Sequence, residues 1–278
     1  MTQFVNNVKT AVLLASLFGI ILAAGAYMGG MQGLTIALII GGALNFFVYF
    51  NSDKLAIKAM RAQQVDENTA PDLVQMVQRL ARNANLPMPR VFICPQQAPN
   101  AFATGRNPKH AAVAVTQGAL KLLSYEELEG VMAHELAHVK NRDTLISTVA
   151  ATVAGVISYL GWIFIFSGGG GRNVHPLVLL VVFLLAPIAA ALIQMAISRS
   201  REYVADADGA RIAGTPAGLI SALQKLEATA KRIPLENEMP SQNHMFIVEP
   251  LTGARTLAKL FQTHPATEQR VAKLRELM

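Results

Sequence analysis

Residues 133–138 read Ala133-His134-Glu135-Leu136-Ala137-His138, an H-E-x-x-H motif that decides how the rest of the chain is interpreted. Two histidines four positions apart lie one above the other on a helix, so both imidazoles can reach one tetrahedral Zn²⁺. The glutamate after the first histidine points beside the metal, where a general base for a zinc-bound water must lie. The motif therefore predicts His134 and His138 as zinc ligands and Glu135 as the catalytic base.

The residues before the motif predict the helix that it requires. Residues 124–127 read Ser-Tyr-Glu-Glu and form a capping box, with Ser124 at the N-cap and Glu127 at position N3. Apolar residues then recur at helical spacing from Leu128 to Leu136. The alternative is a chance match of the motif on a surface helix, and the features described next argue against it.

A catalytic zinc site needs a third protein ligand and an open position. The predicted helix over residues 198–206 offers Glu202 for the ligand. Asp206 lies four residues further on the same face, where its carboxylate can accept the ring N–H of a ligand histidine and fix its tautomer. The alternative for Glu202 is a surface carboxylate paired with Arg199 or Arg201.

The composition favours a membrane protein. The 278 residues are 52% hydrophobic and only 15% charged, and the mean hydropathy is +0.35. The formal net charge is +6, but the sequence shows no dense basic and aromatic patch, so no nucleic-acid partner is predicted. The single cysteine, Cys94, excludes an internal disulfide and lies among apolar residues, which predicts a buried thiol.

Four uncharged stretches are each close to the length that crosses a bilayer: residues 11–28, 34–50, 144–166 and 177–197. They predict two transmembrane hairpins, 1–50 and 144–197, which alternate with soluble parts 51–143 and 198–278. A cleaved signal peptide is the alternative for the first stretch, and a hydrophobic hairpin in a soluble core is the alternative for the second pair.

Loop charges predict the orientation. The links inside the hairpins carry only Arg172, whereas the opposite ends carry Lys9, Lys54, Lys58, Arg61, Lys140, Arg142, Arg199 and Arg201. By the positive-inside rule those ends face the cytoplasm, together with both termini and both soluble parts.

The first soluble part has mixed secondary structure. Residues 71–85 predict a helix, and strands are expected at 91–94, 100–105 and 111–116, the last two joined by a turn at Asn107-Pro108. In the second soluble part, helices are expected at 217–231 and 265–277. A strand beside a protease cleft can bind an extended substrate by backbone pairing, so Asn100, Ala101, Phe102 and Ala103 are candidate substrate-binding residues. A purely structural strand is an equally open interpretation.

Four blocks in this order resemble the HtpX-type membrane zinc metalloproteases, which are gluzincins related to the CAAX prenyl endopeptidases. They are residues 100–105 (NAFATG), 134–143 (HELAHVKNRD), 201–206 (REYVAD) and 263–270 (THPATEQR). The similarity covers nearly the whole chain. CAAX enzymes have more membrane spans, so this chain is similar to the shorter type.

The resemblance implies a polytopic α-helical membrane protein with a cytoplasmic, mainly α, gluzincin-like zincin domain that carries a small β-sheet. It implies a zinc metalloendopeptidase of the bacterial inner membrane with one Zn²⁺ per chain. Such an enzyme cleaves misfolded or surplus membrane proteins and unfolded polypeptides at the cytoplasmic face, in quality control and stress response, and is prone to self-cleavage. His264 and Arg270 match positions that the family places near the cleft, and we predict that one or both stabilise the tetrahedral intermediate or bind substrate; the alternative is a capping and salt-bridge role for the terminal helix.

Two other functions stay open at the level of sequence. A zinc-stabilised membrane adaptor or holdase would bind clients without cutting them, but a closed structural zinc site needs no base such as Glu135. An intramembrane protease would cut inside the bilayer, but the charged residues on both sides of the motif favour a site at the membrane surface or just below it.

Overall fold

The computed structural model describes residues 53–143, 186–230 and 265–278, together with scattered positions between Val8 and Asn51, each of which is helical. The two predicted transmembrane hairpins therefore lie largely outside the described residues. Within the described part of the chain, no helix combines the length and the apolar character that crossing a membrane requires.

The chain divides into two compact units. One contains Met1–Phe50 and Ile146–Ser198, and the other contains Asn51–Leu145 and Arg199–Met278. All the predicted zinc ligands belong to the second unit, so this unit alone is sufficient to describe the site.

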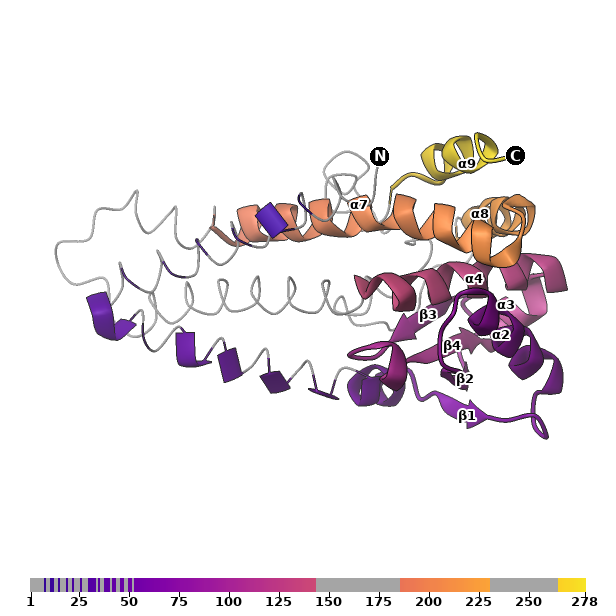
Figure 1. Cartoon of the computed structure of the whole chain (residues 1–278), viewed down its shortest axis with the longest axis horizontal. Helices are drawn as coiled ribbons and strands as arrows, with labels where there is room; N and C mark the ends of the chain where they lie inside the picture. Colours follow the sequence, from indigo (N-terminus) through magenta and orange to yellow (C-terminus); the bar gives the residue numbers. More distant parts are fainter. Residues whose placement is uncertain are drawn as a thin grey trace. The chain divides into compact units, whose positions relative to one another are not determined.

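A four-stranded mixed sheet forms one layer of the second unit (Figure 1). Its strands are β1 (Gln63–Val65), β2 (Arg90–Cys94), β3 (Ala101–Thr104) and β4 (Ala112–Thr116), in the order β1-β2-β4-β3. β2 and β4 are parallel, and both outer pairs are antiparallel. The three predicted strands are confirmed, and a short 3-10 helix, Pro108–His110, lies at the predicted turn. β1 was not predicted because a three-residue strand shows no alternation.

The alternation of side chains gives the sheet two buried faces. Val113 and Val115 of β4 belong to the main core, whereas Ala112 and Ala114 contribute to a smaller cluster with Phe92 on the other face. This explains why β4 is an uninterrupted run of small and β-branched residues. Cys94 is fully buried, and this burial raises its pKa to about 12, so the predicted buried thiol is confirmed.

Besides helical residues 53–59, six α-helices lie in the described part of the chain. They are α2 (Pro71–Asn83), α3 (Gln117–Leu122), α4 (Tyr125–Asn141), α7 (Ala186–Ala213), α8 (Ala217–Ala230) and α9 (Thr267–Arg275). The capping box is present: Ser124 Oγ accepts a hydrogen bond from the Glu127 N–H, and the Glu127 carboxylate accepts one from the Ser124 N–H. The prediction of a mainly α domain with a small sheet is confirmed; the six-residue α3 was not predicted.

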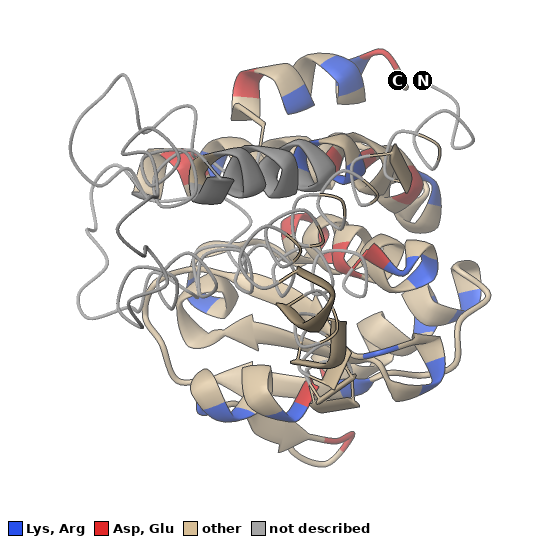
Figure 2. Ribbon diagram, turned by 90° about the vertical axis from the view of Figure 1, so that its left-hand side faces the viewer, with Lys and Arg blue, Asp and Glu red and all other residues tan. Residues whose placement is uncertain are grey.

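Helix α4 lies at the centre of the second unit. It packs against α8, α2 and strand β3, and Figures 1 and 2 show the sheet on one side of it and α8 on the other. Eleven of its 17 residues are buried, and they include His134 and Glu135. The motif that the sequence singles out is therefore in the interior, which argues against a chance match on a surface helix.

Candidate metal centre

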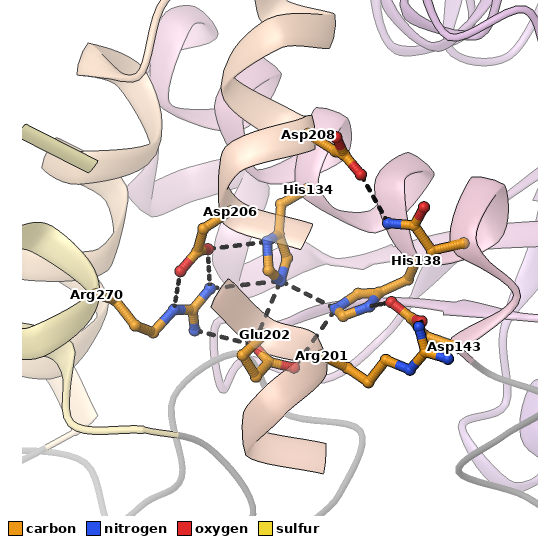
Figure 3. A network of polar contacts seen from close by, with 9 residues as sticks. His134, His138, Asp143, Arg201, Glu202, Asp206, Asp208 and Arg270 are labelled. Carbon is orange, nitrogen blue, oxygen red and sulfur yellow. Dashed lines mark hydrogen bonds and ion pairs between the residues drawn. The ribbon is translucent and has the colours of Figure 1, made fainter. Parts of the chain in front are cut away.

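The three predicted ligands come together from two helices. His134 and His138 project from α4 and Glu202 from α7, and one ligand atom from each lies within 4.8 Å of the others. The two Nε2 atoms are 3.1 Å apart. Glu202 Oε2 lies 3.6 Å from His134 Nε2, and Oε1 lies 3.5 Å from His138 Nε2. Figure 3 shows both imidazoles directed toward the carboxylate across the space between the helices.

A glycine lets the two helices approach at the site. An added Cβ at Gly209 of α7 would lie 2.9 Å from the Cα and 3.0 Å from the N of His134. These are backbone atoms of α4 and cannot rotate away. A side chain at this position would therefore push α7 away from the first ligand.

The substitution Gly209→Ala is expected to separate α4 from α7 and to misplace Glu202. Overpacking of this kind costs about 1–3 kcal/mol of stability, and we expect zinc affinity to fall roughly tenfold, which corresponds to about 1.4 kcal/mol. Melting temperature and zinc competition with a chelator measure the two effects. Ala207→Ser, a similar enlargement at a half-buried position of α7, is the control. Wild-type melting and wild-type affinity in Gly209→Ala would show that this contact is unimportant.

Each ligand histidine has a carboxylate on its other ring nitrogen. Asp206 Oδ1 lies 3.1 Å from His134 Nδ1, and Asp143 Oδ2 lies 3.0 Å from His138 Nδ1. A carboxylate beside Nδ1 favours the tautomer with the proton on that nitrogen, in both rings. Both Nε2 lone pairs are then directed at the space beside Glu202, as metal ligation requires.

Arg270 of α9 completes the buried network. Its Nε and Nη2 donate to the two carboxylate oxygens of Asp206 at 2.9 and 2.7 Å. Its Nη1 lies 3.4 Å from Glu202 Oε2, and its Nη2 lies 3.4 Å from His134 Nε2. The side chain is 1% exposed. Arg270 therefore links α9 to the ligand Glu202 and to Asp206, the carboxylate beside the ligand His134.

The pKa values follow from these contacts. Burial lowers the pKa of His138, but hydrogen bonds to Asp143 and Glu202 outweigh it and raise the pKa well above its ordinary value of 6.5, so a metal ion that binds at Nε2 must displace a proton. Burial raises the pKa of Asp206, but the charge of Arg270 and contacts with His134 and Arg270 hold it below 3.8. Asp206 is therefore ionised at neutral pH, consistent with its role as an acceptor.

The buried residues fit a divalent cation. Glu135, Asp143, Glu202 and Asp206 supply four carboxylates, and Arg201 and Arg270 supply two guanidinium groups, so two negative charges are left for a metal ion to balance. Two imidazole nitrogens and one carboxylate are the ligand set of many catalytic zinc sites, which leave a fourth position open. The site therefore suits Zn²⁺ in its geometry, its ligand types and its charge.

Comparison with known proteins agrees with this geometry. The family model for peptidase family M48 matches residues 67–278, which contain every ligand and every partner described above. The chain belongs to peptidase family M48. The predictions of a zinc metallopeptidase and of His134, His138 and Glu202 as its ligands are thereby confirmed.

Similar proteins cover nearly the whole length of this M48 peptidase. A Protease HtpX homolog from Desulfatibacillum aliphaticivorans is 54% identical over 277 residues, which cover 97% of this chain and 89% of the relative. A Protease HtpX homolog from Burkholderia thailandensis is 53% identical and covers 98% and 97% of the two chains. The predicted resemblance to HtpX-type proteases is confirmed.

The fold is also similar to a solved structure, Ste24p of S. mikatae. The TM-score is 0.60 and the sequence identity is 17%, over 98% of this chain and 66% of that chain. At this identity the likeness shows the fold alone.

The other predicted site residues are placed as follows. Glu135 is buried in α4, 5% exposed, next to His134. Asn100, Ala101 and Phe102 are buried in or beside β3, and Ala103 is half-buried. His264 lies outside the described residues. Sequence reasoning missed the contacts of Asp143 and Arg201, although both residues belong to the quoted family blocks.

Proposed function

We propose that this M48 peptidase is a multi-pass membrane endopeptidase that cuts misfolded or surplus membrane proteins at the cytoplasmic face. The position of β3 supports this choice of substrate. β3 is the last strand of the described sheet, and it packs against α4, the helix that provides two of the zinc ligands. An edge strand can pair with an extended polypeptide segment, which an unfolded chain offers more readily than a folded one.

The register of β3 indicates which residues are available. The Asn100 N–H donates to Thr116 Oγ1 at 2.8 Å, and the Asn100 carbonyl accepts from the Thr116 N–H at 2.9 Å. Antiparallel pairs alternate between bonded and non-bonded positions. Since the Asn100 backbone already bonds to Thr116, the N–H and C=O groups of Ala101 and Ala103 are the ones directed away from β4. They are our candidates for backbone pairing with substrate.

Ala103→Pro is expected to weaken substrate binding because proline removes the N–H donor. One lost hydrogen bond is worth about 0.5–1.5 kcal/mol, so kcat/KM should fall roughly three- to tenfold. Zinc content should not change. Ala103→Val keeps the N–H and has a high strand propensity, so it serves as the control. Equal losses in both variants would indicate packing rather than pairing as the role of this position.

The proposed mechanism assigns a role to each group around the zinc ligands. Bound Zn²⁺ supplies Lewis-acid polarisation of the peptide carbonyl and lowers the pKa of an attacking water. Glu135 accepts the proton of that water and delivers it to the leaving amine. We propose that the buried guanidinium of Arg270, whose Nη1 lies 3.4 Å from Glu202 Oε2, stabilises negative charge that develops on the carbonyl oxygen. We propose the same role, or substrate binding, for His264.

The proposed topology rests on the two apolar hairpins and on the basic residues at their ends. It can be tested with single cysteines in a Cys94→Ser background. Gly170→Cys, in the link of the second hairpin, should react with a membrane-impermeant maleimide in intact cells. Glu67→Cys, in the soluble part before α2, should react only after lysis. Labelling in the opposite pattern would reverse the orientation, and labelling of both in intact cells would contradict two returning hairpins.

The proposed substrate class is tested with purified, zinc-loaded protein. Unfolded casein and a destabilised membrane protein should be cut, whereas a stable folded protein of similar size should not. We also expect self-cleavage after zinc addition. Client binding without any cleavage would instead favour the membrane adaptor or holdase.

A further inference from the structure

Asp143 reaches His138 because the chain bends at the end of α4. The helix ends at Asn141, and Arg142 adopts the left-handed conformation with φ 56° and ψ 32°, its N–H bonded to the His138 and Val139 carbonyls. This conformation is costly for a residue with a side chain and turns the chain back on the helix. Asp143 then lies buried, 3% exposed, with Oδ2 3.0 Å from His138 Nδ1.

The second oxygen of Asp143 faces the other ligand helix. Oδ1 lies 3.2 Å from Arg201 Nη1. Arg201 is 5% exposed and directly precedes the ligand Glu202 in α7. Figure 3 shows Asp143 between His138 and Arg201. The Asp143 carboxylate therefore contacts the ligand His138 of α4 and also Arg201, which directly precedes the ligand Glu202 in α7.

The same arrangement occurs twice in the site. Asp206 contacts His134, and Arg270 forms an ion pair with Asp206. In the same way, Asp143 contacts His138, and Arg201 forms an ion pair with Asp143. A buried carboxylate is stable as an ion only with a partner such as a guanidinium. Each imidazole thus has a carboxylate beside its Nδ1, and each carboxylate has a guanidinium group beside it.

The pair Asp143–Arg201 also joins two distant points of the chain. Residues 144–200 separate the two side chains, and bringing the ends of such a segment together costs entropy. Asp143 lies five residues after His138, and Arg201 lies one residue before Glu202. The contact is therefore well placed to set the distance between the ligands of the two helices.

We propose that Asp143 is a positioning residue for zinc: with Arg201, it orients the His138 ring and sets the spacing between His138 and Glu202. This inference rests on the zinc site and is independent of the proposed substrate. It predicts a defect in metal binding that is measurable without any peptide.

Zinc affinity, measured in full-length protein by chelator competition, tests the proposal. Loss of such an outer carboxylate typically weakens metal binding 10- to 100-fold. We expect a loss of this size for Asp143→Ala and a smaller one for Asp143→Asn, which keeps an acceptor but not the charge. Arg201→Met should also weaken binding, and Arg201→Lys should restore part of it. The Asp143→Asn/Arg201→Met double variant should lose less than the product of the two single effects.

Asp208→Asn is the matched control. Asp208 is a buried carboxylate that also joins α7 to α4, since it accepts a hydrogen bond from Asn141 Nδ2 at 2.8 Å, and it forms an ion pair with Arg211 rather than with the zinc ligands. Its replacement should leave zinc affinity and the visible spectrum of the Co²⁺-substituted protein unchanged, whereas Asp143→Ala should alter both. Wild-type affinity and spectrum in Asp143→Ala, or in Asp143→Asn if the alanine variant does not fold, would overturn the proposal.

Discussion

Glu135→Gln is expected to lower kcat/KM for peptide cleavage roughly 10²- to 10⁴-fold, the usual contribution of a general acid–base group. Glutamine has nearly the same shape but cannot accept the proton of the attacking water. Glu135 is not among the three residues whose ligand atoms converge, so zinc content should stay at one ion per chain. Cleavage of an unfolded substrate, measured together with metal content, separates loss of the base from loss of the metal.

Glu129→Gln provides the control for this variant. Glu129 lies on the same helix, and its carboxylate forms an ion pair with Arg79 at 2.9 Å, away from the zinc ligands. The same chemical change there should leave cleavage within about twofold, because partly exposed ion pairs contribute about 0–1 kcal/mol. Equal activity of Glu135→Gln and wild type would remove Glu135 from the mechanism and reopen the hypothesis of a closed, structural zinc site.

Glu202→Ala is expected to remove both zinc and activity. The carboxylate is the only one of the three converging ligands that comes from α7, and it lies 3.4 Å from Arg270 Nη1. Without this carboxylate, only two imidazoles remain to bind zinc, and they bind it weakly. Arg270 also loses one of its carboxylate contacts. We expect stoichiometric zinc in the wild type and substoichiometric zinc, with cleavage at background level, in the variant. Metal analysis after dialysis measures the difference.

The same substitution at Glu268 controls for a general effect of losing a carboxylate. Glu268 is an exposed residue of α9, two positions before Arg270. Glu268→Ala should keep full zinc content and full activity. If Glu202→Ala instead retained one tightly bound zinc, the third ligand would have to be another residue.

Local sequence patterns predicted much of the fold and the ligands. The capping box indicated the start of α4, and the four-residue spacing of His134 and His138 indicated one face of it. The run of small and β-branched residues over 111–116 and the apolar stripe over 71–85 likewise predicted β4 and α2. These features depend on residues close together in the chain, whose geometry is set by the helical and strand periods.

The features that could not be predicted depend on distant residues or on unusual backbone. Asp143 contacts His138 only because Arg142 takes a left-handed conformation, which arginine rarely adopts and which no sequence pattern indicates. The ion pair of Asp143 with Arg201 joins positions far apart in the sequence. The closeness of α7 to α4 at Gly209 was likewise not predicted, because a glycine inside a helix does not reveal which neighbouring backbone it contacts.

The central claim is that His134, His138 and Glu202 meet at a single zinc ion. Crystals of the purified, zinc-loaded protein, measured on both sides of the zinc absorption edge, test it most directly. We predict one anomalous peak per chain, about 2.0–2.2 Å from both histidine Nε2 atoms and from a Glu202 carboxylate oxygen. A peak bound by other residues, or one that excludes Glu202, would contradict the account.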